Sequence, residues 1–370
     1  MNKRFLLAFA ATLALSANVF AADINITANG VPVKTTAAPI SKDGSTLVPI
    51  RAVSEALGSD VAWDADKKTA TIKNEGLEII LTLDNKTAQV NGKDVEMPVA
   101  ATLVNGSVMV PVRFVAENLK SYVKWTQGEG VSPSVVSIYS EYPTKTESGI
   151  GISSYWKSEV TKLSDTETFT YEEIVPQFSG FPDASKQDSL NKTEAAKVDA
   201  GFEDSKKSVE ETLDAVDGDI SFSMEVRANY DFLGVDSGLL QIKDYGESYF
   251  GGAHANPYED YRLYDINTLN VLEFKDLFTS SAIENDELKT PILSAVDNAL
   301  KKEDYADVTN PFADGWSLDA VSDFYIKDGN LVLVYAPYVI APFSAGFVEF
   351  PIPIGDLQGV LAEPYKNLKF

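Results

Sequence analysis

The chain has 370 residues, no cysteine and one histidine, and its 55 acidic residues outnumber its 31 basic ones, which gives a formal net charge of −24. This charge disfavours the binding of nucleic acid or anionic lipid and favours cationic partners. A redox-active copper site needs a cluster of imidazole or thiolate ligands, so the histidine and cysteine counts exclude one.

Residues 1–21 have the composition of a secretory signal peptide. Lys3 and Arg4 precede an apolar run over residues 5–17, and small residues stand where a signal peptidase reads the chain. We therefore expect a secreted mature chain that begins at Ala22 and is located at a bacterial cell wall or envelope surface. No later stretch approaches the ~18 apolar residues of a membrane helix, so we expect no transmembrane segment in the mature chain.

An internal repeat fills most of residues 22–140. Residues 47–57 (LVPIRAVSEAL) return as residues 109–119 (MVPVRFVAENL), and Trp63 returns as Trp125, with every matched pair 62 positions apart. In each copy the pattern predicts an Asn-Gly hairpin, a strand, a short helix that starts at a proline, and a further strand that ends in V-x-W. We expect two tandem small α+β repeats with both tryptophans buried.

The doubled motif V-P-[IV]-R-x-[VA]-[SA]-E-x-L with its V-x-W ending resembles the copper amine oxidase N-terminal-like domain, a stalk module of bacterial surface proteins. The resemblance implies that residues 22–140 hold or space the protein at the cell wall. Arg51 and Arg113 lie four residues before Glu55 and Glu117. A helical ion pair is the expected role of each arginine, and ligand binding is the alternative.

Residues 141–154 are rich in Gly, Ser and Thr and show little periodicity, so we expect a linker here that proteases cut first. Residues 155–370 form the expected second domain, an α+β fold with an antiparallel sheet covered by two long helices. Alternation predicts its strands, and apolar residues at helical spacing predict its helices. The strands are expected at 171–178, 222–230, 323–326, 331–335 and 346–354, and the helices at 184–216 and 288–300.

Two segments of the second domain are too unusual to be generic. Residues 249–254 (YFGGAH) place a double glycine before the histidine, and residues 338–346 (YVIAPFSAG) form an apolar, aromatic loop. With these motifs, residues 171–361 resemble the PdaC/RsiV-like extracellular domain, which occurs beside peptidoglycan deacetylases and as the lysozyme-sensing ectodomain of an anti-sigma factor. The resemblance implies a sensing or binding module. The candidate binding residues are Tyr249, Gly251, Gly252, His254, Tyr338, Pro342, Phe343 and Gly346.

These residues also have structural interpretations. The ring of His254 could cap a carbonyl in a turn, and the aromatic residues of the 338–346 segment could pack in the core. Two functions stay open. The first is a non-catalytic, envelope-associated binding protein whose second domain binds a cationic protein such as lysozyme or a cell-wall glycan. The second is a cell-wall polymer hydrolase or a deacetylase accessory protein. No catalytic residue, metal or cofactor is predicted.

Overall fold

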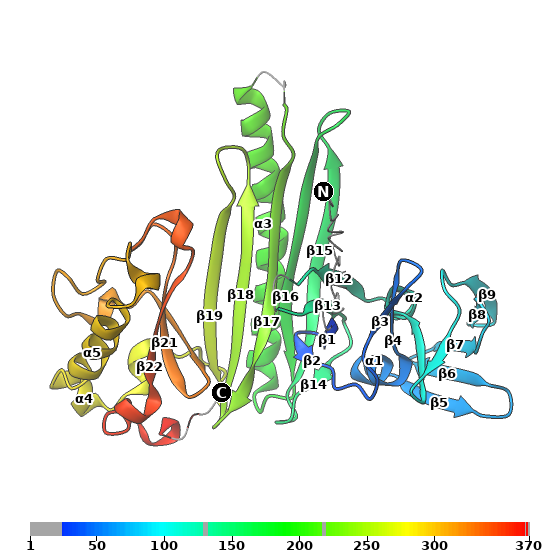
Figure 1. The fold of residues 1–370 in the computed structure, drawn as a ribbon, viewed down its shortest axis with the longest axis horizontal. Coiled ribbons are helices and arrows are strands. Elements are labelled where there is room, and N and C mark those ends of the chain that lie inside the picture. Colours follow the sequence, from blue (N-terminus) through cyan, green and yellow to red (C-terminus); the bar gives the residue numbers. More distant parts are fainter. Residues whose placement is uncertain (1–23, 129–131, 217–219, 367, 369–370) are drawn as a thin grey trace, which may run out of the picture.

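A computed structural model of the chain describes residues 24–128, 132–216, 220–366 and 368, so the expected signal peptide lies outside the described residues. The fold is mixed, with many strands and few helices. In Figure 1 the longest strands and the longest helix stand together in the middle, with the N-terminal half on one side and the last hundred residues on the other. Among the described residues, no helix has both the length and the apolar character that a membrane-spanning helix requires.

The N-terminal half contains the same order of elements twice, separated by the extra strand β7 (Leu77–Thr82). Each helix directly follows the proline of the repeated motif, and each Asn-Gly turn has positive φ at both residues. The first copy comprises β1 (Ile24–Ala28), β2 (Val31–Pro32), β3 (Ile40–Lys42), β4 (Ser45–Pro49), α1 (Ile50–Ala56), β5 (Asp60–Asp64) and β6 (Thr69–Asn74). The second comprises β8 (Thr87–Val90), β9 (Lys93–Glu96), β10 (Thr102–Val104), β11 (Ser107–Pro111), α2 (Val112–Asn118), β12 (Tyr122–Thr126) and β13 (Ser134–Tyr139).

The two copies are joined around a local two-fold axis. Strands β4 and β11 pair antiparallel with Val48 opposite Val110, which are the same position in the two copies. The other two sheets each mix strands of both copies, in the orders β12-β13-β1-β2 and β5-β6-β7-β8-β9. One apolar core, with Val53 and Val115 fully buried, therefore serves both copies. The pairing is that of a symmetric dimer built into one chain.

The expected burial of the two tryptophans is wrong. Trp63 and Trp125 occupy equivalent positions on β5 and β12, but their exposed fractions are 39% and 40%. Each V-x-W pair lies on one face of its strand, and the apolar core covers the valine end of that face. The indole rings at the other end of that face remain at the surface.

Residues 141–154, which we expected to form a linker, are built into the fold. They contribute β14 (Thr144–Lys145) and the start of β15 (Gly151–Lys162), and several of their side chains are buried. These residues pack around Asn29, a fully buried residue of the first Asn-Gly turn. Its amide donates to the carbonyl of Tyr142 (2.9 Å) and to the Thr144 hydroxyl (3.2 Å). Its Oδ1 accepts from the Ser140 amide (2.7 Å) and the Ser154 hydroxyl (2.8 Å).

The second half is built on a six-stranded sheet in the order β14-β15-β16-β17-β18-β19. The chain crosses from β16 to β17 through the helix α3, so these two strands are parallel. The expected antiparallel pairing is wrong for this pair, whereas the other four pairs of the sheet are antiparallel. Val198 and Phe202 of α3 pack on Tyr171 of β16 because the helix lies along one face of the sheet. The elements are β16 (Thr168–Ser179), α3 (Ala184–Ala215), β17 (Met224–Asp236), β18 (Leu239–Tyr249) and β19 (Asn256–Asp265).

The second predicted helix does not cover this sheet. Ile292 and Val296 of α5 (Lys289–Ala299) pack on Phe350 of a separate three-stranded sheet, which has the order β20-β21-β22. Its strands are β20 (Asp323–Lys327), β21 (Asn330–Tyr335) and β22 (Val348–Pro353). The remaining helices are α4 (Ser280–Glu284) and the short 3-10 turns η1 (Phe274–Leu277), η2 (Glu303–Tyr305), η3 (Leu318–Ala320), η4 (Phe343–Ala345), η5 (Ile354–Leu357) and η6 (Glu363–Tyr365).

Polar contacts hold the small sheet to the large one. The fully buried side chain of Gln241 on β18 pairs with the backbone of Ile326, donating to its carbonyl at 2.9 Å and accepting from its amide at 2.8 Å. The carboxylate of Asp323 accepts from the backbone amides of Tyr261 (2.9 Å) and Phe324 (2.7 Å). Burial raises the pKa of Asp323 to about 6, although these two hydrogen bonds oppose the shift.

We expect Asn29→Ala to destabilise the protein by about 3 kcal/mol or more, because it removes four side-chain hydrogen bonds and leaves buried partners unpaired. Asn91→Ala is the matched control. Asn91 is the equivalent residue of the second copy, has the same positive φ, and is exposed with one side-chain bond, to the Glu78 amide. Its substitution should cost about 1 kcal/mol or less. Equal losses for the two variants in urea unfolding would contradict the central role of Asn29.

The raised pKa of Asp323 should make stability depend on pH. Well below pH 3.8 the carboxyl is protonated in both the folded and the unfolded chain. As the pH rises towards 6, the unfolded chain ionises first, so the contribution of Asp323 to stability is lost. The stability of Asp323→Asn relative to the unsubstituted protein should therefore rise between pH 4 and 7, by up to about 2 kcal/mol. Urea unfolding at four pH values tests this, and a difference independent of pH would refute it.

Candidate functional site

Two loops that are far apart in the sequence meet in the second half. One connects β18 to β19 and carries His254, and the other connects β21 to β22 and carries Tyr338 and Phe343. The imidazole stacks on the Phe343 ring with 3.6 Å between centroids, and its Nε2 lies 2.9 Å from the Tyr338 hydroxyl. The rings of Tyr338 and Phe343 are 5.6 Å apart. The structure thus brings these three predicted residues together in one aromatic cluster.

Both ring nitrogens of His254 have hydrogen-bond partners. Nδ1 lies 2.8 Å from the carbonyl oxygen of Ala255. A carbonyl can only accept, so Nδ1 donates to it, while Nε2 is hydrogen-bonded to the Tyr338 hydroxyl. His254 therefore both caps a carbonyl, as its structural interpretation expects, and orients a residue of the second loop.

The second loop presents apolar surface to solvent. Tyr338 and Val339 have exposed fractions of 67% and 57%, whereas Ile340 is buried and anchors the loop. Tyr338 has a φ of 69°, which is uncommon for a residue other than glycine. Its backbone amide donates to the Ala341 carbonyl at 3.0 Å, which helps to hold this conformation. Val339 was not among the predicted site residues, because a single valine has no chemical signal in the sequence.

The other predicted residues support the cluster. The Tyr249 hydroxyl donates to the Gly252 carbonyl (3.1 Å), and its ring packs edge-on against Phe222. A Cβ on Gly251 would lie 2.8 Å from the Phe222 ring, so glycine is required for this close approach. Gly346 has φ 66° and ψ −148°, a conformation that side chains other than hydrogen disfavour. Pro342 is exposed beside Phe343.

Sequence reasoning missed a charged network beneath α3. The Arg262 guanidinium of β19 pairs with Glu194 of α3 (3.1 Å) and with Asp244 of β18 (Nε to Oδ2, 2.6 Å). Burial raises the pKa of Asp244 to about 6, while Arg262 acts to lower it. The side chains of all three residues are nearly inaccessible to solvent, so the network fixes the helix on the sheet and offers no open catalytic site. Charged residues stand next to each other at 243–244 and at 259–260, so no alternation in the sequence marked these two strands.

The described residues contain no group of three or more His, Asp or Glu side chains placed to hold a metal ion. The lone imidazole is bonded to a carbonyl and a phenol, and no carboxylate is among its hydrogen-bond partners. The imidazole is thus held within the aromatic cluster by these two contacts.

Two protein families match parts of the chain. Residues 27–132 match the copper amine oxidase N-terminal domain, and residues 275–355 match DUF3298, a family of proteins of unknown function. The second match begins after β19, so it covers the small sheet and the Tyr338 loop but not His254. The comparison with curated proteins finds no match.

Among solved structures, the chain is similar to a DUF3298 family protein from Pseudomonas aeruginosa PAO1, with 18% identity, a TM-score of 0.43, and coverage of 58% of this chain and 95% of that one. It is also similar to a DUF3298 family member from Bacteroides fragilis NCTC 9343, with 18% identity, a TM-score of 0.44, and coverage of 58% and 94%. The two family matches thus fall within the two parts of the chain for which the sequence showed resemblances, residues 22–140 and residues 171–361.

Proposed function

We propose that the protein is a secreted, envelope-associated binding protein without catalytic activity, whose second half binds a cationic protein at the aromatic cluster of His254, Tyr338 and Phe343 and at the adjacent Val339. The observation that carries this proposal is the exposure of Tyr338 and Val339 on a loop whose base is fixed by stacking and hydrogen bonds. An exposed aromatic side chain that is already ordered loses little conformational freedom on binding, which suits it to anchor an interface.

The charge of the second half favours a basic partner. Residues 155–370 contain 40 acidic and 17 basic side chains. Such an excess accelerates the encounter with a cationic protein. Added salt screens the charges and slows this encounter. Lysozyme is the test case because it is strongly basic. In addition, the PdaC/RsiV-like domain that residues 171–361 resemble includes a lysozyme-sensing ectodomain.

We expect Tyr338→Ala and Phe343→Ala each to weaken lysozyme binding by about 1 to 3 kcal/mol, mainly through faster dissociation. Higher salt should instead slow association in every variant. Surface plasmon resonance with the mature chain, at low and at high salt, separates the two rates.

Val339→Ala and Val160→Ala form a matched pair for this test, since both valines are exposed, at 57% and 64%. Val160 is the control because it lies near the end of β15 and is not part of the aromatic cluster. Only the first should weaken binding. The proposal fails if the mature chain has no affinity for lysozyme at low salt, or if folded Tyr338 and Phe343 variants bind as before. Binding to purified peptidoglycan in place of lysozyme would favour the glycan as partner.

A further inference from the structure

Two equivalent grooves lie on either side of the local two-fold axis of the N-terminal half. The β12 groove has a volume of about 480 Å³ and lies between α2, β12 and the β3–β4 turn of the first copy. The β5 groove, of about 550 Å³, lies between α1, β5 and the β10–β11 turn of the second copy. Each groove is thus completed by the other copy. The matched lining residues include Arg113, Val123 and Trp125 in the β12 groove, and Arg51, Val61 and Trp63 in the β5 groove.

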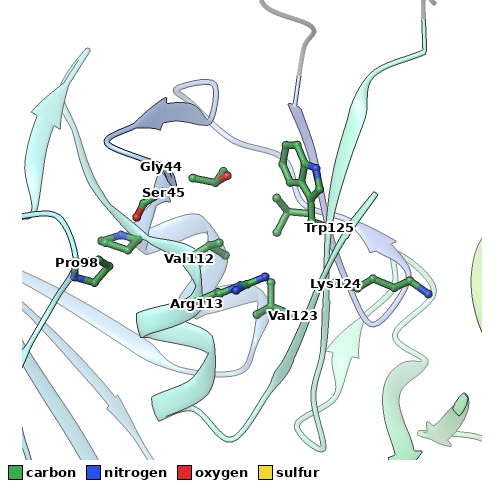
Figure 2. A pocket seen from close by; sticks show the side chains of 11 residues that line it. Gly44, Ser45, Pro98, Val112, Arg113, Val123, Lys124 and Trp125 are labelled. Atoms are coloured by element: carbon green, nitrogen blue, oxygen red, sulfur yellow. The ribbon is translucent and has the colours of Figure 1, made fainter. Parts of the chain in front are cut away.

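An arginine and a tryptophan face the open space of each groove. Figure 2 shows the Arg113 side chain reaching from α2 towards β12, where the Trp125 ring stands, while Lys124 points away. Lys124 is bound to Glu172 of the second half at 2.9 Å. The cation available inside the β12 groove is therefore the guanidinium of Arg113.

Packing does not explain why both copies have these side chains. In the 62-residue register, the residues other than glycine that are identical and exposed in both copies are one arginine, one glutamate and one tryptophan. Arg51 pairs with Glu55 at 3.2 Å, but Arg113 has no ion pair with Glu117 or any other described residue. A helical ion pair thus accounts for one arginine only, and neither exposed tryptophan contributes a buried core side chain.

The N-terminal half has little net charge, in contrast to the rest of the chain. Residues 22–140 contain 13 acidic and 11 basic side chains. The acidity that repels polyanions therefore belongs to the second half, and an anionic ligand can approach the grooves without strong repulsion from the repeat itself.

We propose that each groove binds one segment of an anionic polysaccharide. The flat, apolar face of Trp63 or Trp125 packs against the C–H face of a sugar ring. The guanidinium of Arg51 or Arg113 pairs with a carboxylate or phosphate on the same or the next residue of the polymer, a bidentate contact that its planar fork suits. The groove volumes fall within the usual range of about 300–1,000 Å³ for small-molecule sites, enough for a short segment of such a chain.

The two-fold arrangement makes the repeat bivalent. A polymer that occupies both grooves gains affinity through effective concentration, whereas a short oligomer fills each groove independently. This site is separate from the aromatic cluster of the second half, and its two grooves act whether or not that cluster binds a protein.

Isothermal titration calorimetry of the mature chain with tetragalacturonate, a carboxylated tetrasaccharide, tests the proposal. We expect two sites per chain, one site in Trp63→Ala and in Trp125→Ala, and none in the double variant. Arg51→Gln and Arg113→Gln should each abolish one site, whereas Glu55→Gln and Glu117→Gln should leave both. For long polygalacturonate, losing one groove should reduce affinity on the order of 10²-fold.

Two further ligands and the double tryptophan variant make the outcome decisive. Neutral maltotetraose should not bind, and equal binding of it would overturn the role of arginine. A ribitol phosphate oligomer identifies phosphate as the recognised anion if it binds while tetragalacturonate does not. Absence of binding to both anions, or two remaining sites in a folded double tryptophan variant, overturns the proposal.

Because the exposed arginines are not part of the core, their variants remain informative if a tryptophan variant fails to fold. Lysozyme binding should be unchanged in all groove variants. Failure of the unsubstituted protein to bind lysozyme would therefore contradict the proposed function of the aromatic cluster and not the proposal for the grooves.

Discussion

The buried side chain of Asn29 is the contact on which the arrangement of the two halves depends. Its amide group satisfies four partners on residues 140–154, and Ser154 in turn lies 2.8 Å from the Tyr230 hydroxyl on β17 of the large sheet. A Cβ on the neighbouring Gly30 would come within 2.9 Å of the Phe232 amide nitrogen, so the first Asn-Gly turn is pressed directly against the second half. Tyr122 adds a second contact by donating to Glu172 at 2.5 Å. The second Asn-Gly turn has the same backbone but lies in solvent. The repeat therefore contains two copies of one turn, and only the first contacts the second half. We call the hydrogen bonds of Asn29 to residues 140–154 the Asn29 joint.

The sequence predicted most elements that have a local signal. The 62-residue offset located α1 and α2, and alternation located β17, because period and turn residues act over a few neighbours. It did not predict that β16 and β17 are parallel, since pairing depends on where α3 carries the chain. Nor did it predict that Trp63 and Trp125 are exposed, because strand alternation specifies a face but not how far the core extends along it. Residues 141–154 have the composition of a linker, yet their hydrogen bonds to Asn29 and the pairing of β15 bury them. Composition reports local flexibility, and here the tertiary contacts outweigh it.

For the candidate site, the sequence identified the residues but not their relation. His254 and Tyr338 are 84 positions apart, and their hydrogen bond depends on the docking of the small sheet on β18 through Gln241 and on β19 through Asp323. Val339 and the network of Arg262, Asp244 and Glu194 had no motif that could single them out. A residue type with distinctive chemistry, such as a lone histidine after two glycines, can be recognised in isolation, whereas an exposed valine gains meaning only from its neighbours in space.

The distribution of charge gives the two halves complementary roles within the proposed function. The N-terminal half is close to neutral and has two grooves that offer arginine and tryptophan, whereas the second half is strongly acidic and offers an aromatic surface. A polyanion and a cationic protein attract each other, so a protein that binds both must keep their sites apart. The Asn29 joint accomplishes this by fixing the halves side by side, with the central sheet and α3 between the grooves and the small sheet (Figure 1). A flexible linker would let the acidic half swing over the grooves and compete with the polymer for their arginines. Under the two proposals, the burial of residues 141–154 thus holds the two sites apart as well as stabilising the fold.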